Sequence, residues 1–199
     1  MTTPKILKQK ILVFAGSTRA ASLHRQLAQQ ATETLRRAGM DANFADLRDY
    51  PMPLYEGDLE AASGVPATAK ALKELFREAD GFVIASPEYN GSYPALLKNA
   101  IDWVSRPEPG ERPLAVFRGK VAAILSASPG PGGGRRGLRQ LRELLGMIGV
   151  TVIPEEVAVA QAGDAFDGAG RLMRPQDAAA LEQLAAGLVL AAERETVAA

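Results

Sequence analysis

Cysteine is absent from this sequence, and histidine occurs once among its 199 residues. The lack of thiols excludes disulfide bonds, cysteine nucleophiles and thiolate metal sites, and a single histidine argues against a histidine-built metal centre. Net charge is also lacking, because 23 Lys and Arg residues balance 23 Asp and Glu residues. Without a net positive field the chain has little to attract nucleic acid or an anionic membrane surface. We therefore expect neither of these as a partner, and no metal.

Long apolar runs are missing as well. No stretch reaches the length of a membrane-spanning helix, and the charged first residues are not followed by the apolar region of a secretory signal. We therefore expect a cytoplasmic protein. The length suits one domain with a sizeable core, so we expect a single domain over residues 1–199.

What the sequence does contain is an alternation of short apolar runs with helical patterns. Such alternation predicts right-handed crossovers and a doubly wound parallel sheet with helices on both faces. Two prolines and a glycine predict a loop at residues 50–58. The expected strands are 11–15, 41–47, 81–86, 121–125 and 151–159, the last interrupted at 154–156, and the expected helices are 22–37, 65–78, 95–104, 135–148 and 175–194.

The first expected strand ends in a loop rich in hydroxyl groups. Gly16 permits a sharp turn, Ser17, Thr18 and Ser22 carry hydroxyls, and Arg19 carries a fork of donors. The next helix begins at about Ser22, so its first N–H groups and the positive end of its dipole face the loop. This arrangement predicts an anion-binding site. The simpler alternative is an ordinary strand-to-helix turn in which Ser22 is the N-cap.

The glycine content of this loop restricts the kind of anion. With one glycine, the loop lacks both the Gly-x-Gly-x-x-Gly dinucleotide pattern and the Gly-x-x-x-x-Gly-Lys-Ser/Thr triphosphate pattern. A terminal phosphomonoester, such as that of FMN, fits the loop better than a pyrophosphate.

Two further loops follow the third and fourth expected strands. Residues 87–94 hold two tyrosines, an asparagine and a glycine, and residues 126–134 are rich in glycine. In an open parallel sheet, ligands bind beyond the C-terminal strand ends where the strand order reverses, here between the first and third strands. The loops after these two strands are therefore expected to share one site.

Three motifs carry a resemblance to a known family. Gly16-Ser-x-Arg-x-x-Ser22, Pro87-Glu-Tyr-Asn90 and Pro94-x-x-Leu-Lys-Asn-Ala-Ile-Asp-Trp103 resemble, in order and spacing, the NADPH-dependent FMN reductase family, which includes chromate, quinone and azo reductases. The resemblance implies a flavodoxin-like fold, a five-stranded parallel sheet in the order 2-1-3-4-5. It also implies non-covalent FMN, with NADPH or NADH as co-substrate. The electrons would pass to a small-molecule acceptor, which is a quinone, an azo compound, a metal oxyanion or free flavin. Members of the family usually form homodimers, some of which pair into homotetramers.

The resemblance also implies cofactor-binding residues in the three loops. No catalytic side chain is expected, because hydride transfer to a flavin needs no proton from the protein. The candidates are Ser17, Arg19, Ser22, Leu23 and His24 for the phosphate, Pro87, Glu88, Tyr89 and Asn90 for the ring, Ser128 on the other side of the ring, and Thr18 and Gly91 in the same loops.

Some positions depart from the family pattern. His24 stands where asparagine is frequent. Because histidine titrates, its strength as a hydrogen-bond donor near the phosphate should depend on pH. Gly91 stands where a bulkier residue is common, so we expect that wall of the site to be open. The loop at 126–134 has more glycine and proline than usual, and we expect it to be mobile.

Several residues have more than one interpretation. Tyr89 and Tyr93 either serve the site or anchor their loop by packing on Trp103. Arg135 and Arg136 either attract the phosphates of a pyridine nucleotide or belong to a solvated helix face. The solvated face is the preferred interpretation for two further arginines of the same expected helix, Arg139 and Arg142.

Two other functions fit the same fold. One is a passive electron carrier like flavodoxin, but such carriers tend to be acidic and this chain is neutral. The other is an interaction module that has lost its flavin. Flavin absorbance of the purified protein distinguishes the second option from the enzyme.

Overall fold

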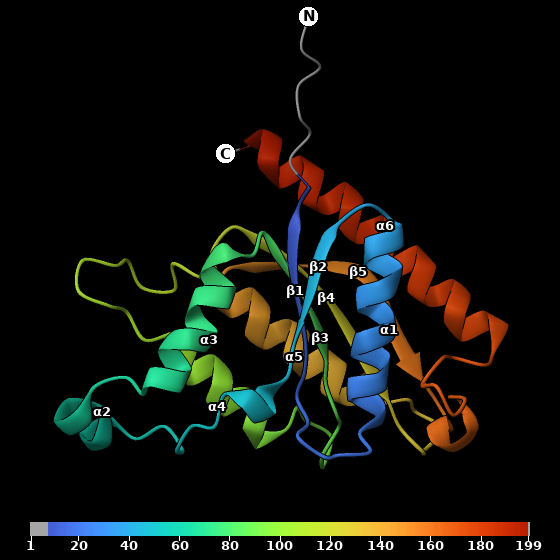
Figure 1. Cartoon of the computed structure of the whole chain (residues 1–199), viewed down its shortest axis with the longest axis horizontal. Coiled ribbons are helices and arrows are strands. Elements are labelled where there is room, and N and C mark those ends of the chain that lie inside the picture. The colour runs from blue at the N-terminus through green and yellow to red at the C-terminus, as the bar shows by residue number, and fades with distance from the viewer. Residues whose placement is uncertain (1–7, 199) are drawn as a thin grey trace, which may run out of the picture.

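The computed structural model of the chain describes residues 8–198. Its sheet has five parallel strands in the order β2-β1-β3-β4-β5, which confirms the predicted order. In Figure 1 the strands run downward, so the loops that follow them gather at the lower edge. The strands are β1 (Lys10–Ala15), β2 (Asp41–Ala45), β3 (Gly81–Ala85), β4 (Lys120–Ala127) and β5 (Val150–Val159).

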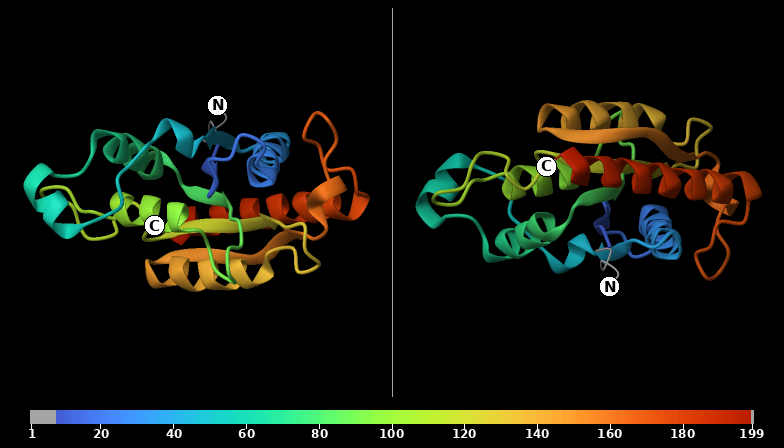
Figure 2. Two further views of the ribbon diagram at one scale, coloured as in Figure 1. Left: turned by 90° about the horizontal axis from the view of Figure 1, so that it is seen from below. Right: turned by 90° about the horizontal axis from the view of Figure 1, so that it is seen from above.

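Helices cover both faces of the sheet. One buried cluster joins the sheet to α1 and α6, and a second joins its other face to α3, α4 and α5. The long α6, red in Figure 2, lies beside β4 and β5. The helices are α1 (Leu23–Arg37), α2 (Gly57–Ser63), α3 (Ala67–Glu78), α4 (Ala95–Val104), α5 (Arg135–Met147) and α6 (Pro175–Ala198), with short 3-10 turns at Leu47–Asp49 and Ala162–Asp164.

The helix α6 is the longest, at 24 residues, yet it lacks the apolar length that a bilayer span requires, and so does every other helix in the described part of the chain.

The central strands are apolar on both sides because both of their faces are covered. In β1, Ile11 and Val13 pack toward α1, whereas Leu12 and Phe14 pack toward α3 and α4. All five residues of β3 are buried. Continuous apolar sequence is typical of parallel strands buried in this way. The two strands that carry the predicted site, β1 and β3, are therefore interior strands covered on both faces.

The segment at 50–58 differs in part from the prediction. It is irregular up to Glu56, but α2 begins at Gly57. The Glu56 carboxylate accepts hydrogen bonds from the N–H groups of Asp58 and Leu59, at 2.9 and 2.8 Å, and so caps the helix. Gly64 then ends it at a φ of 72°. Glutamate is an unusual N-cap, so the composition of this stretch did not indicate a helix.

The predicted interruption of the last strand is a bulge within one continuous strand. Ala122 of β4 pairs with Val152, but Ile124 pairs with Glu156, so extra residues of β5 lie opposite one residue of β4. The guanidinium of Arg142 donates to the carbonyls of Val152 and Ile153 at 3.1 and 2.7 Å. Arg142 thus supports the bulge, and the solvated-face interpretation is wrong for this residue.

Candidate functional site

The loops after β1, β3 and β4 meet at one pocket. The N–H of Gly16 donates to the carbonyl of Ala85 at 2.9 Å, so the first two loops leave the sheet side by side (Figure 1). All of the predicted cofactor-binding residues line this pocket except Thr18, Asn90 and Gly91. The lining residues are Ser17, Arg19, Ser22, Leu23, His24, Pro87, Glu88, Tyr89, Ala127, Ser128 and Pro129.

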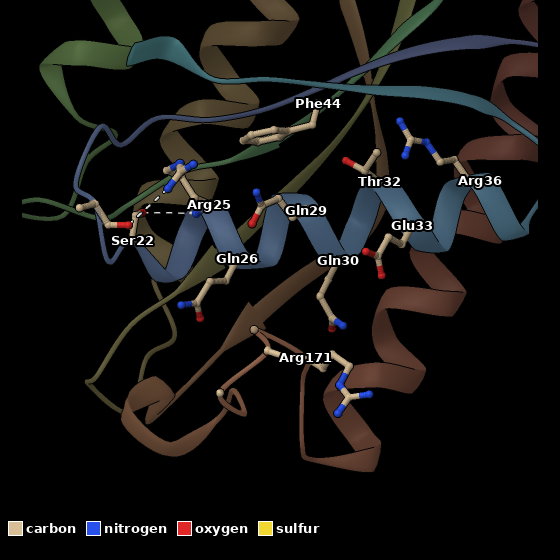
Figure 3. Close-up of a pocket in the computed structure, with 14 residues that line it drawn as sticks. Ser22, Arg25, Gln26, Gln29, Gln30, Thr32, Glu33, Arg36, Phe44 and Arg171 are labelled. Carbon is tan, nitrogen blue, oxygen red and sulfur yellow. Dashed lines mark hydrogen bonds between the residues drawn. The ribbon is translucent and has the colours of Figure 1, made fainter. Parts of the chain in front are cut away.

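The start of α1 offers unpaired donors to the pocket. Ser22 is the N-cap, and its Oγ accepts from the N–H of Arg25 at 3.3 Å, as drawn in Figure 3. Ser22 is therefore an N-cap, as the simpler alternative also expects. This role does not exclude an anion site, because the N–H groups of Leu23 and His24 have no acceptor among residues 8–198. These two donors lie at the positive end of the helix dipole.

Arg19 adds a free positive charge at the same place. Its side chain is exposed and forms no hydrogen bond or ion pair with the described residues. Its backbone N–H lies 3.5 Å from the Oγ of Ser17, which is buried. A guanidinium without a carboxylate partner can form a charge-assisted, two-pronged contact with a phosphate.

His24 is held between α1 and the end of β4. The N–H of Ala127 donates to its Nε2 at 3.2 Å, and the Oγ of Ser126 lies 3.5 Å from the same nitrogen. Because Nε2 accepts, the proton of the neutral ring is on Nδ1. Burial, reinforced by the charge of Arg19, lowers the pKa of His24 to about 4. The ring is therefore neutral near pH 7. The strength of His24 as a hydrogen-bond donor, which we expected to depend on pH, should change only at acid pH.

Glu88 ties the second loop to α5. Its Oε2 accepts from the N–H of Gly137 at 3.1 Å, in the first turn of a helix whose N-cap, Gly134, has no side chain to offer. A Cβ on Gly137 would lie 3.2 Å from the Cβ of Glu88, so the absence of a side chain eases this close approach. The carboxylate thus serves as the missing cap and fixes the wall of the pocket.

Asn90 and Gly91 form the tight turn of this wall. Both have positive φ, 54° and 81°, as a type I′ turn requires. The N–H of Tyr89 donates to the carbonyl of Ser92 at 2.9 Å and is therefore not free for a ring ligand. The Asn-Gly pair was a recognisable turn signal in the sequence. Asn90 and Gly91 shape the loop, and Gly91 faces open space on the side away from the pocket.

Trp103 anchors a different loop from the one expected. Its Nε1 and the Nδ2 of Asn99 both donate to the carbonyl of Pro53, at 2.8 and 2.9 Å. Tyr55 packs edge-on against the indole at 5.1 Å, and its N–H donates to Oδ1 of Asn99. No ring contact joins Trp103 to either expected tyrosine within residues 8–198, so that interpretation is wrong.

This anchored segment borders a second hollow beside the pocket. Thr18 lines it, together with Tyr50, Met52 and Leu96, and its volume is about 370 Å³. Asn99 and Trp103 therefore position a wall near the site, a role that the sequence reasoning missed. The motif spacing pointed to these residues, but the loop they hold lies far away in the sequence.

The glycine-rich loop is anchored rather than free. Gly133 and Gly134 have positive φ, and a Cβ on Gly134 would lie 2.0 Å from the Oγ of Ser126. The N–H of Gly130 donates to the Oγ of Ser128, and its carbonyl accepts from the N–H of Gln161. The high glycine content thus serves close packing, and the expectation of a mobile loop is not supported by these contacts.

A larger groove of about 740 Å³ follows the flank of α1 (Figure 3). Gln26, Gln29 and Gln30 project into it from α1, and Arg171 faces it from the turn at 167–171. Only its end at Ser22 reaches the edge where the strands finish. We therefore place the candidate site at the smaller pocket, where the loops converge.

Comparisons with known proteins agree with this geometry. A family model described as NADPH-dependent FMN reductase matches residues 9–164. The chain is 39% identical over 165 residues to an NAD(P)H-dependent FMN reductase of Pseudomonas aeruginosa, covering 82% of this chain and 84% of that protein. It is 40% identical over 139 residues to a quinone reductase of Escherichia coli, covering 69% and 70%.

A solved structure shows the same relationship. The flavoenzyme NAD(P)H:(acceptor) oxidoreductase FerB from Paracoccus denitrificans superposes with a TM-score of 0.76 at 28% identity, covering 94% of this chain and 98% of that one. The predicted motifs, the sheet order and these similarities all agree. The chain belongs to the NADPH-dependent FMN reductase family and is an oxidoreductase.

Proposed function

We propose that this chain holds FMN non-covalently in the pocket at the ends of β1, β3 and β4 and transfers electrons from NAD(P)H to a quinone. The observation that carries the proposal is the group of unsatisfied donors at the start of α1. The N–H groups of Leu23 and His24 and the guanidinium of Arg19 all lack acceptors within the described chain. A phosphomonoester supplies the acceptors that they lack.

The rest of the pocket suits the ring of a flavin. Pro87 and Tyr89 line the pocket from the loop after β3, and Ser128 and Pro129 line it from the loop after β4. We place the flat ring in the slot between these two loops. Tyr89, which lines the pocket, is 54% exposed. One side of the slot is therefore open to a second ligand.

When bound, FMN supplies the redox chemistry, since it takes a hydride from NAD(P)H and gives electrons to the acceptor. The residues of this chain bind and orient. Arg19 and the first turn of α1 hold the phosphate, and Glu88 fixes the loop that flanks the ring by binding Gly137. His24 is kept neutral by burial, which lowers its pKa to about 4, and its Nε2 is occupied by the N–H of Ala127. We assign no acid or base to the pocket.

The quinone is proposed because relatives of this chain in Escherichia coli and in plants are named quinone reductases or quinone oxidoreductases. Azo compounds, metal oxyanions and free flavin are further acceptors to be compared with it. We also propose that the protein is a homodimer or homotetramer, as the family pattern implies, which analytical ultracentrifugation tests.

Anaerobic stopped-flow reduction tests the function. Protein loaded with FMN is mixed with NADPH or NADH in the absence of an acceptor, and the absorbance of oxidised flavin should disappear and return when a quinone is added. Steady-state rates should follow a ping-pong law. If dithionite reduces the bound flavin but neither nucleotide does, the protein is an electron carrier. If FMN does not bind, the flavin-free module is the correct interpretation.

A further inference from the structure

A second groove, of about 560 Å³, lies along the first turns of α5. It adjoins the proposed flavin pocket through a single tight turn, because Tyr89 at one end of that turn lines the pocket and Gly91 lines the groove. Its lining residues are Gly91, Arg135, Arg136, Arg139, Gln140, Arg142 and Glu156.

The arginines of this groove are poorly neutralised. Glu156 is the one carboxylate in the lining, and it already pairs with Arg135 at 3.2 Å and Arg142 at 3.4 Å. Arg136 is 86% exposed, and its Nε lies 3.8 Å from the carboxylate of Glu88. Arg139 is exposed and has no hydrogen bond or ion pair within residues 8–198. The guanidiniums of Arg136 and Arg139 are thus open to solvent.

This arrangement opposes the stability of α5. Arg135 and Arg136 are its first two residues, where the positive end of the helix dipole disfavours cations. Arg135 and Arg139 are spaced i,i+4, and Arg136 and Arg139 are spaced i,i+3, and like charges at these spacings destabilise a helix. An anion in the groove relieves both kinds of repulsion. The stability of the fold therefore gives no reason for Arg135, Arg136 and Arg139 to lie together here.

The groove along α1 offers a contrast. Its arginines are engaged, since Arg25 pairs with Asp46 at 2.8 Å, Arg36 donates to the carbonyl of Ala42 at 2.8 Å, and Arg171 pairs with Asp167 at 2.8 Å. An anion there would have to break existing contacts. In the α5 groove it would meet free donors.

We propose that the α5 groove binds the 2′-phosphate of NADPH through Arg136 and Arg139 and so selects NADPH over NADH. The inference rests on the proposed function, because it assigns a place to the nucleotide that function requires. A phosphomonoester dianion matches the fork of an arginine. The groove adjoins the flavin pocket at the turn that carries Tyr89 and Gly91, so we place the nicotinamide end of the nucleotide at the pocket and its 2′-phosphate in the groove.

Calorimetry without turnover tests the site. The probes are adenosine 2′,5′-bisphosphate, which carries the 2′-phosphate, and 5′-AMP, which lacks it. With FMN added, the parent protein should bind the bisphosphate more tightly. Arg136→Gln and Arg139→Gln should each weaken it about tenfold, the loss expected for one charge-assisted contact at an exposed position, and should leave 5′-AMP unaffected. Raised salt should reduce the difference.

Arg112→Gln is the matched control, because Arg112 is exposed, lies outside the groove and forms no side-chain hydrogen bond or ion pair with the described residues. It removes the same charge and should change neither affinity. Equal binding of the two probes by the parent protein, or equal losses in the control and in the groove variants, would overturn the proposal.

Steady-state kinetics separates this inference from the proposed function. In the groove variants KM for NADPH should rise about tenfold while KM for NADH stays constant. If the FMN-loaded parent oxidises neither nucleotide, the proposed function fails. If it oxidises both with one KM, only the inference fails. If the variants slow the reduction of chromate but not the oxidation of NADPH, the groove serves an anionic acceptor and the inference is wrong.

Discussion

Arg19 has no protein partner within the described chain, whereas Arg25, for example, pairs with Asp46. Arg19 is therefore available to bind the FMN phosphate. Replacing it with alanine should weaken FMN binding by about 2 kcal/mol, or roughly thirtyfold, because a charge-assisted contact to the phosphate is lost. Riboflavin lacks the phosphate, so its affinity should change little. Fluorescence titration of both ligands measures the difference. Equal losses for FMN and riboflavin would place the phosphate elsewhere.

His24 should make the stability of the flavin-free protein depend on acid pH. Its pKa falls from 6.5 to about 4 on folding, so the unfolded chain takes up the proton first. The stability contribution is complete above pH 6.5 and is lost as pH falls from 6.5 to 4. The full loss is about 3 kcal/mol, because each pKa unit corresponds to about 1.4 kcal/mol.

Denaturant unfolding at several pH values between 7 and 4 measures this effect. Carboxylates also titrate in this range, so the quantity to follow is the difference in unfolding free energy between the parent protein and His24→Asn. That difference should shrink as pH falls. A difference that stays constant from pH 7 to pH 4 contradicts the assignment.

At the scale of secondary-structure elements, the start of α5 depends on glycine. Gly134 has a φ of 88°, and a Cβ there would lie 2.0 Å from Oγ and 2.8 Å from Cβ of the buried Ser126. Gly134→Ala should therefore destabilise the protein by about 2–4 kcal/mol, the sum of overpacking and a left-handed backbone. Because Ser126 also contacts His24, affinity for FMN should fall as well.

Gly132 provides the control for this prediction. It lies in the same loop, has no atom within 4 Å of a Cβ position and does not have a positive φ. Gly132→Ala should change the unfolding free energy by less than about 1 kcal/mol. Thermal or denaturant unfolding measures the loss of stability in both variants. Similar losses in the two would mean that the contact at Ser126 is not what requires glycine.

At the scale of the whole molecule, FMN should stabilise the fold. A ligand that binds only the native state at a hundred times its Kd adds about 2.7 kcal/mol. For a chain of 199 residues this corresponds to a rise in Tm of about 5–10 °C. Differential scanning fluorimetry with FMN and with riboflavin measures it. An unchanged Tm at saturating FMN, or an equal rise for Arg19→Ala at the same FMN concentration, would contradict the pocket assignment.

The sequence by itself determined the five strands and every α-helix except α2. Continuous apolar runs such as those in β1 and β3 predict strands buried on both faces, because no exposed face is left for polar residues. Helical periodicity and Ser22 as N-cap placed α1 correctly. These are local signals, and each is carried by neighbouring residues. The convergence of the loops after β1 and β3 followed from parallel topology alone.

Only the tertiary structure decided which groups remain available for a ligand. His24 accepts from Ala127, Glu88 caps α5 at Gly137, and Trp103 holds Pro53. Each of these pairs joins segments far apart in the chain, so its formation depends on how the strands align and how the helices pack. Arg142 and Arg139 lie on the same helix, yet one is committed to the bulge of β5 and the other is free within the described residues. The sequence spacing of the two arginines does not predict this difference. The carbonyls that bind Arg142 belong to the bulge region, which forms only when β4 and β5 pair with a shift in register.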